Sequence, residues 1–513
     1  MTGLEKSVPI HPGPKSLLRR YLTPFDCITL GLALILALGA CSPKASPSPD
    51  PTATLASPGV ATSPPSFGTQ ALRKGTATPL PPIPATPNES TPSPLGVTAA
   101  QLRGMQVNLW YPWGGAGGDS FREIVDGFNR SNQWGIQVNA TGYGDYGLLD
   151  DAMATAITSG SLPDVVVDYG YQARSWDLSN VLAPLNPYLE DPVWGLTPEE
   201  QADFYPAFWS EDLTNVGYEG QAMRLGIPYY RSAYVLFYNQ TWAEELGYPT
   251  PPTTPEDFRV RACAAVEAVK QGGDKTALGK GGWLVTSTPG ALLGWIYAFG
   301  ASITAPNDQG YLFNTPSTSQ AFEYLKGLLD SGCAWTATGI DVQAAFESRQ
   351  ALFVVGSLQD IPAQAQAFAK SGSTDHWVVI PFPSTDQPVV VTYGPSLFLT
   401  KASPDRQLAG WLVIEWLVYP PNQAEFVQEQ GVYPSRVSTG YSLVTEDSFQ
   451  WGQAIGLLPD ARSEPSLASW SMVQWALSDA STQLFSQKFT ADQVPALIGE
   501  LDSVAQEIFS QVH

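Results

Sequence analysis

The chain has 513 residues and a formal net charge of -22, from 48 acidic and 26 basic side chains. An acidic chain without a basic stripe argues against a nucleic-acid partner, because phosphates would be repelled. Only His376 lies in the body, since His11 precedes it and His513 is the last residue, which leaves no ligand set for a zinc site. The sequence has no GxSxG or P-loop motif, and His376 lies in a predicted surface loop rather than a catalytic triad. We therefore expect neither a metal nor a cofactor.

The N-terminal residues have the organisation of a secretory signal. Basic residues between Lys15 and Arg20 precede an uncharged apolar run from Cys27 to Ala40. The sequence Leu38-Gly39-Ala40-Cys41 resembles the lipobox of bacterial lipoproteins, which implies cleavage before Cys41 and a diacylglycerol on its thiol. One alternative is a transmembrane anchor, but the apolar run is shorter than the roughly 20 residues that a spanning helix needs. A cleaved signal without lipid is the other alternative, and the long stretch before the run leaves the true start open.

The segment after Cys41 has the composition of a tether. It is rich in Pro, Ser, Thr, Ala and Gly and has few apolar side chains, so it cannot bury enough surface to offset its ordering entropy. We expect a signal at residues 1–40 and a lipidated, disordered tether at residues 41–97. The Ser, Thr and Pro content would also suit O-glycosylation. The protein is then exported and anchored by lipid to the outer face of a bacterial membrane.

The body begins with alternating strands and helices. Strands are predicted at 106–110, 136–140 and 164–167, and the last is a continuous apolar run typical of a parallel strand covered on both faces. Helices are predicted at 121–128, after a capping box from Ser120 to Glu123, and at 148–159. Such βαβ units bind ligands beyond the carboxyl ends of their strands. A predicted glycine-rich loop at 113–118 lacks the GxGxxG spacing, so we expect it to bring backbone and Trp113 close to a small ligand.

A series of motifs follows in a fixed order along the body. They are Leu109–Trp113, Phe128–Asn132, Leu162–Val166, Ile227–Ala233, Leu236–Asn239, Pro251–Phe258, Tyr393–Ser396 and Tyr433–Arg436. From about Gly104 to the C-terminus, this pattern resembles the family 1 extracellular solute-binding proteins, the receptors of ABC importers for sugars and related polyols. Pro255 departs from the pattern, because the family usually has Trp there.

The resemblance implies an α/β fold of two lobes, like that of periplasmic binding proteins, with a hinge and an interlobe cleft. The first lobe is expected at 98–232 plus 396–432 and the second at 233–395 plus 433–513. The chain is expected to cross between them near Ser232 to Tyr238, near Ser396 and near Val432. Hinge closure would bury the solute, and permease subunits would recognise the closed form. The resemblance implies a binding protein rather than an enzyme, and we expect a monomer.

Sugar ligands call for aromatic rings against their apolar faces and polar groups around their hydroxyls. Family cleft positions correspond to Trp113, Tyr146, Tyr229, Ser232, Ser357, Tyr393, Gly394 and Arg436. From the second lobe we add Trp283 and Trp295. Arg231 is expected either to pair with an anionic ligand group or only to bridge the lobes. Core packing is the competing interpretation for each aromatic ring.

The substrate class is narrowed by two departures from glycerol-phosphate receptors of the family. Gly170 stands where they carry an acidic residue, and no Arg is evident near Leu467 to Trp470. We therefore expect a neutral mono- or oligosaccharide, of a kind and length that the sequence leaves open. A secreted glycoside hydrolase, which needs two opposed carboxylates, and a lectin-like surface protein are the alternatives.

Two cysteines remain in the body, Cys263 and Cys333. An even pair in an exported protein predicts a disulfide. Two buried free thiols are the alternative.

Overall fold

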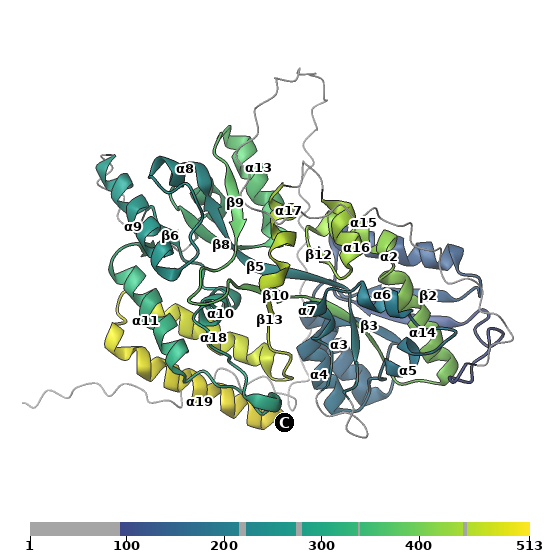
Figure 1. Ribbon diagram of the computed structural model, residues 1–513. Coiled ribbons are helices and arrows are strands. Elements are labelled where there is room, and N and C mark those ends of the chain that lie inside the picture. Colours follow the sequence, from purple (N-terminus) through teal and green to yellow (C-terminus); the bar gives the residue numbers. More distant parts are fainter. Residues whose placement is uncertain (1–92, 215–221, 273–279, 337–338, 445–448) are drawn as a thin grey trace, which may run out of the picture. The chain divides into compact units, whose positions relative to one another are not determined.

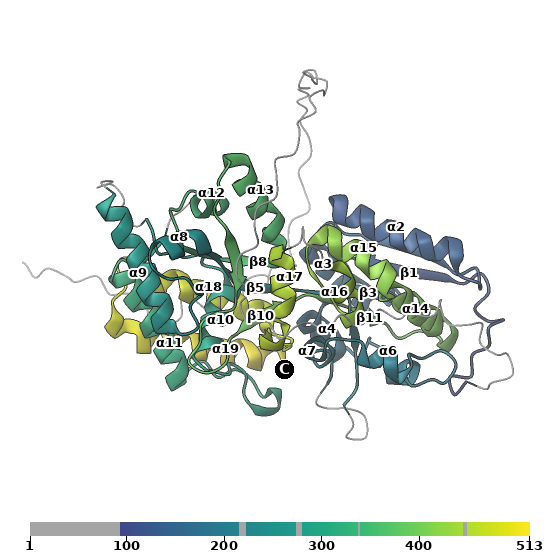
Figure 2. The same ribbon diagram turned by 45° about the horizontal axis from the view of Figure 1, so that its top comes forward.

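The computed structural model describes residues 93–214, 222–272, 280–336, 339–444 and 449–513. Two mixed sheets flanked by helices organise this part of the chain (Figure 1 and Figure 2). The predicted signal, Cys41 and residues 42–92 of the predicted tether lie outside the described residues. Within the ranges given, no helix is long and apolar enough to cross a membrane.

The first sheet has the strand order β2-β1-β3-β11-β4. These strands are β2 (Gln137–Gly142), β1 (Gln106–Tyr111), β3 (Val165–Tyr169), β11 (Pro395–Leu399) and β4 (Gly226–Pro228). β1 pairs in parallel with β2 and with β3, whereas β11 runs antiparallel to β3 and β4. The predicted parallel strands at the start of the body are therefore confirmed.

Helices cover both faces of this sheet, which explains the apolar run in β3. Val166 packs in one core cluster with side chains of α3 (Tyr146–Ser159) and α4 (Gly170–Leu178). Val165 and Val167 belong to the cluster that holds α2 (Gly115–Ser131) and α14 (Pro404–Leu417). Figure 2 shows α2 and α14 side by side with α15 (Pro420–Gln430). Three short helices follow α4 and precede β4: α5 (Asn186–Leu189), α6 (Pro198–Ala202) and α7 (Pro206–Trp209).

The predicted glycine-rich loop is wrong, because α2 begins at Gly115 and takes up most of it. Its N-cap is Gly114, which has no side chain to cap the helix, so the predicted capping box at Ser120 is also wrong. The glycines allow close packing instead. A Cβ on Gly118 would lie 2.7 Å from the carbonyl oxygen of Trp113. Gly114 would place one 3.2 Å from the Cα of Gly144.

The second sheet has the strand order β13-β10-β5-β8-β6-β7, and β9 and β12 also pair with β5. Its strands are β5 (Tyr230–Asn239), β6 (Trp283–Leu284), β7 (Ala334–Trp335), β8 (Phe353–Ser357), β9 (Trp377–Ile380), β10 (Val390–Tyr393), β12 (Tyr433–Pro434) and β13 (Ala461–Ser463). Its helices are α8 (Gln240–Glu245), α9 (Pro255–Gln271), α10 (Pro289–Ala298), α11 (Pro316–Asp330), α12 (Val342–Glu347), α13 (Ile361–Ser371), α17 (Phe449–Gly456), α18 (Trp470–Leu484) and α19 (Val494–Val512), whereas α16 (Val437–Leu443) packs on α15.

Three chain segments lie together between the two sheets: the junctions at Tyr229 and Gly394, and β12. We call them the crossing segments. Tyr229 alone separates β4 from β5, and Gly394 alone separates β10 from β11. These junctions are adjacent, since the Tyr229 amide donates to the Pro395 carbonyl over 3.1 Å. On its other side, the start of β5 pairs with β12, with Arg231 opposite Tyr433. Gly394 is required here, because a Cβ would lie 2.5 Å from the Tyr230 carbonyl oxygen.

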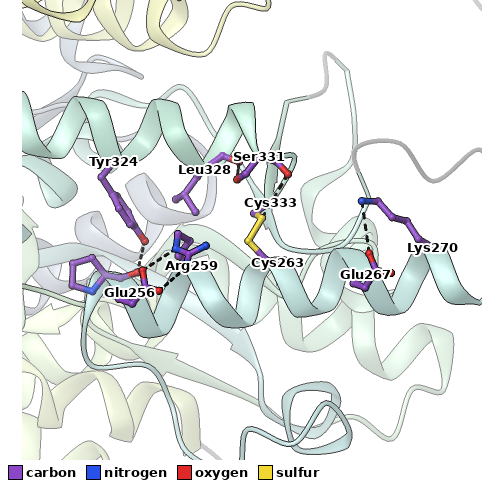
Figure 3. Close-up of a disulfide and its surroundings, with 10 residues drawn as sticks. Glu256, Arg259, Cys263, Glu267, Lys270, Tyr324, Leu328, Ser331 and Cys333 are labelled. Carbon is purple, nitrogen blue, oxygen red and sulfur yellow. Dashed lines mark hydrogen bonds and ion pairs between the residues drawn. A yellow bond between two sulfur atoms is a disulfide. The ribbon is translucent and has the colours of Figure 1, made fainter. Parts of the chain in front are cut away.

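A disulfide joins Cys263 of α9 to Cys333, which follows α11, as the sequence predicts (Figure 3). Their Cα atoms are 4.5 Å apart, and the bridge spans 70 residues of sequence. A hydrogen bond of 2.6 Å from the Tyr324 hydroxyl to the Pro255 carbonyl ties the same two helices near the start of α9. The two connections fix α9 against α11 in the part of the molecule that carries the second sheet.

Candidate functional site

A cavity of about 340 Å³ lies between elements of the two sheets. One wall follows β3 and precedes β4, and the other is formed by the end of β10 and the turn after β13. The lining residues are Tyr169–Tyr171, Arg174, Ser210–Leu213, Asp308, Thr392–Gly394 and Ser463–Ser466. The volume is in the range of small-molecule sites. We take this cavity, beside the crossing segments, as the candidate binding site.

Tyrosine rings form the wall on the first-sheet side. β3 passes into α4 without a loop, so Tyr169 and Tyr171 lie at the carboxyl end of a parallel strand, where ligands bind in such sheets. Their rings are stacked, with centroids 5.2 Å apart and planes 8° from parallel. The Tyr146 ring, at the start of α3, lies 4.6 Å from that of Tyr169. These rings give the wall an apolar surface edged with hydroxyls.

On the opposite side, Tyr393 lines the cavity. Tyr234 of β5 and Tyr393 of β10 stack with ring centroids 4.7 Å apart. Both line an adjoining cavity of about 290 Å³, together with Ser357 and Asp360. Burial raises the pKa of Tyr393 to about 12, although Ser232 and Ser357 lower it in part. The phenol therefore stays protonated at neutral pH and can donate a hydrogen bond to a ligand.

Glu464 is a carboxyl group on the second-sheet wall. It accepts hydrogen bonds from Nε1 of Trp470 over 3.2 Å and from Nε2 of Gln474 over 2.9 Å, and both reach Oε2. Burial raises its pKa to about 7. Burial, and after it the charge of Glu464, also raise the pKa of Tyr171 across the cavity. Glu464 thus faces the tyrosines of the first-sheet wall.

Arg231 binds the crossing segments to one another. The side chain is 1% exposed, and its guanidinium donates to the carbonyls of Tyr230 and Pro395 over 2.8 and 2.7 Å. Its Nε lies 2.7 Å from Glu211, and Nη2 lies 3.7 Å from Asp212. Of the two expected roles, the structure supports the bridging one, because these contacts occupy the guanidinium.

Some of the site residues predicted from the sequence meet at these cavities. Tyr393 lines both, Gly394 lines the first and Ser357 the second. Tyr146 stacks on the lining residue Tyr169. Ser232 is fully buried and pairs with Tyr393 between β5 and β10. This subset of the predicted residues lies together.

Trp283 and Trp295 lie in the core instead, which corrects the expectation that they face the cleft. They are 1% and 0% exposed, with ring centroids 5.6 Å apart. Trp295 also packs edge-on against Phe258 and Phe382. For Trp295 the cause is its helix, α10, all of whose residues from Gly290 to Ala298 are buried, so that a ring on any of its faces meets protein.

Trp113, Tyr229 and Arg436 also lie away from the two cavities. Trp113 is half-buried and packs on Tyr229 and Phe426, with ring centroids 5.8 and 5.0 Å away. Tyr229 is fully buried. Arg436 is buried and donates to the carbonyls of Val418 and Glu200 over 3.0 and 2.7 Å. These three residues support the region around the crossing segments in this structure.

Residues of the two cavities that were not predicted from the sequence are Tyr169, Tyr171, Tyr234 and Glu464. The first two had a signal, because Asp168-Tyr169-Gly170-Tyr171 follows the apolar run of β3 at the strand end where ligands bind. Tyr234 lies between the motifs Ile227–Ala233 and Leu236–Asn239, and it is the one residue of β5 that is only partly buried. Glu464 had no comparable signal, because it follows a strand of three residues.

Comparison with known proteins gives one family and a consistent fold. The family described as bacterial extracellular solute-binding protein matches residues 123–442. Putative binding proteins of Brucella abortus (strain 2308) and Brucella suis biovar 1 (strain 1330) are each 23% identical over 386 residues, which cover 74% of this chain and 87% of theirs.

Solved structures share the fold at low sequence identity. The sugar-binding protein MalE from the phytopathogen Xanthomonas citri is 21% identical with a TM-score of 0.67, covering 79% of this chain and 98% of that one. The cyclic alpha-maltosyl-1,6-maltose binding protein from Arthrobacter globiformis is 19% identical with a TM-score of 0.63, covering 79% and 99%. UgpB from Mycobacterium tuberculosis, solved with glycerophosphocholine, is 18% identical with a TM-score of 0.58, covering 79% and 98%. The two-lobe fold of periplasmic binding proteins is thereby confirmed.

Proposed function

Because this chain belongs to the family of bacterial extracellular solute-binding proteins, we propose that it is the receptor of an ABC importer for a neutral mono- or oligosaccharide. The observation that carries the proposal is the cavity between the two sheets, walled by the stacked Tyr169 and Tyr171 at the carboxyl end of β3 and by Tyr393 at the end of β10. Its position beside the crossing segments suits a ligand that is enclosed when the lobes close.

The chemistry of the lining fits a sugar. Aromatic faces such as those of Tyr169 and Tyr171 pack against the C–H faces of a pyranose ring. Phenol hydroxyls, Ser463 and the Glu464 carboxyl surround them with acceptors and donors for sugar hydroxyls. Several sugar-binding proteins are among the solved structures of this fold, which favours this class over others that the fold serves.

Closure is the second part of the proposal. Residues 98–232 plus 396–432 would rotate against residues 233–395 plus 433–513, with the junctions at Tyr229 and Gly394 as hinge points. The closed monomer would then be recognised by the permease subunits, which take up the solute. Recognition of the closed form alone would couple transport to ligand occupancy.

The third part is a lipid anchor on Cys41, with residues 42–97 as its tether to the membrane. Two or three acyl chains hold a protein stably where a single chain is marginal. Cys41→Ser should therefore abolish partitioning into the detergent phase, or leave the precursor unprocessed. Normal processing and partitioning of this variant would contradict the anchor and leave the binding function untouched.

A thermal-shift screen over a sugar library tests the binding function, because a ligand of the native state raises its melting temperature. Tyr393→Ala should weaken the best sugar on the order of tenfold or more, as expected for a buried aromatic contact. Tyr441→Ala is the matched control, since that ring lies 54% exposed on α16.

Release of reducing sugar would favour a glycoside hydrolase instead. Sugar binding without closure would favour a lectin-like protein.

A further inference from the structure

The carboxyl groups around the candidate cavity outnumber the cations. Its lining holds Glu211, Asp212, Asp308 and Glu464 against the single guanidinium of Arg174. The Arg174 guanidinium donates to the Leu213 carbonyl. Arg231 lies behind the wall and neutralises charge on Glu211 and Asp212. Even with Arg231 counted, the described residues at this cavity supply four carboxyl groups and two cations.

Glu464 differs from Glu211 and Asp212 in its partners. Glu211 and Asp212 contact Arg231, whereas Glu464 is held by two neutral donors, Trp470 and Gln474. Both donors reach Oε2, and no hydrogen bond from the described residues reaches Oε1. The side chain is half-buried and lines the cavity. One oxygen therefore fixes the carboxyl group while the other remains as an acceptor for a ligand.

We infer that Glu464 determines the charge selectivity of this receptor: it accepts a hydrogen bond from a sugar hydroxyl and excludes sugars that carry a carboxylate or phosphate. This inference rests on the proposed function, since it concerns the same cavity. The physical reason is that Glu464 is ionised above its pKa of about 7, so an anion near it then meets like charge in a site of reduced dielectric. A hydroxyl donor instead gains a charge-assisted hydrogen bond.

Gln474 and Trp470 act here as positioning residues. Both lie on α18, and their donors orient Oε2 from behind the wall. Well above the pKa of Glu464, removing the Gln474 donor leaves the charge in place but loosens its geometry. It should therefore weaken the neutral sugar a few-fold while leaving the rejection of anions intact.

The test is calorimetric binding at about pH 8.5, where Glu464 is ionised, of the best neutral sugar from the screen and of its uronic acid, in which one CH₂OH becomes a carboxylate. The wild type should bind the uronic acid about 100-fold more weakly than the neutral sugar. Glu464→Gln should weaken the neutral sugar about tenfold and reduce the discrimination to about tenfold or less. Glu425→Gln, the same change on an exposed residue of α15, should alter neither, and melting curves check that each variant folds.

Equal binding of the two sugars by the wild type, or unchanged discrimination in Glu464→Gln, would overturn the inference while sugar binding itself stands. Absence of binding to every sugar in the library, whatever its charge, would overturn the proposed function and the inference with it. Loss of discrimination in Gln474→Leu as large as in Glu464→Gln would also contradict the separate role assigned to the charge.

Discussion

The Ser463 hydroxyl donates a hydrogen bond of 2.6 Å to Oε1 of Glu211. Ser463 ends β13 of the second sheet, and Glu211 lies on the segment before β4 of the first. The other oxygen of Glu211 lies 2.7 Å from Nε of Arg231. The two walls of the candidate cavity are therefore joined through a carboxylate that is itself held by the crossing segments.

Ser463→Ala should favour the open form, because it removes this hydrogen bond between the walls. Loss of about 1 kcal/mol corresponds to a shift of about fivefold in the closure equilibrium. The affinity for the best sugar should fall by a similar factor, and small-angle scattering should show a larger radius of gyration when the site is partly occupied. Ser478→Ala, which removes an exposed 3.4 Å bond to the Ser287 carbonyl, is the control. Identical sugar affinities in the two variants would contradict a role of the Ser463–Glu211 hydrogen bond in holding the walls together.

Arg231→Met should destabilise the fold by about 3–5 kcal/mol, because Glu211 and Asp212 would keep their buried charges without a partner. Urea unfolding monitored by tryptophan fluorescence measures the change. Arg130→Met removes an exposed pair with Glu123 and should cost less than about 1 kcal/mol. Similar losses of unfolding free energy in both variants would mean that the contacts of Arg231 do not stabilise the crossing segments.

Replacing both Cys263 and Cys333 by Ala should lower the free energy of unfolding by roughly 2–4 kcal/mol, mainly because the unfolded chain gains freedom. Mass spectrometry of the exported protein without reductant should find one linked pair. Two free thiols that alkylate readily in protein from an oxidising compartment would contradict the disulfide.

The free energy of unfolding of the ligand-free protein should fall as the pH rises from about 5 to 8. Burial raises the pKa of Glu464 and of Asp150 to about 7 each, and it raises that of Asp168 as well. The folded state then holds protons that the unfolded chain has already released, so stability is full below the unfolded carboxyl pKa values and declines through the folded ones. Asp168→Asn should flatten the decline, measured by urea unfolding at several pH values. An unchanged slope would show that Asp168 is ionised in the folded protein throughout.

Trp295→Ala should destabilise the protein by about 3–5 kcal/mol, because it empties space between Phe258 and Phe382 in the core. The measurement is again urea unfolding, with Trp475→Ala as the control at a ring that is 68% exposed. The control should change stability by less than about 0.5 kcal/mol. A Trp295→Ala variant that is stable but binds sugar weakly would instead indicate that this ring contacts the sugar.

The sequence predicts the fold better than the site, for physical reasons. The run Val165–Val167 signals a strand covered on both faces because burial leaves a local pattern. The Cys263 and Cys333 pair follows from an even count in an exported chain. Which way a ring points depends on packing from distant segments, so Trp295 could not be distinguished from Tyr393 by its neighbours. Glu464 reaches the cavity only because β13 pairs with β10, a contact between segments far apart in the chain.

Calorimetric titration of the wild type with the best sugar, combined with small-angle scattering of the free and saturated protein, tests the central claim most directly. We predict saturable binding with one sugar per chain, a smaller radius of gyration in the complex, and loss of about tenfold or more in affinity for Tyr393→Ala. Saturable binding without compaction, or full affinity in Tyr393→Ala, would contradict the claim that the tyrosine-lined cavity between the two sheets closes on the sugar.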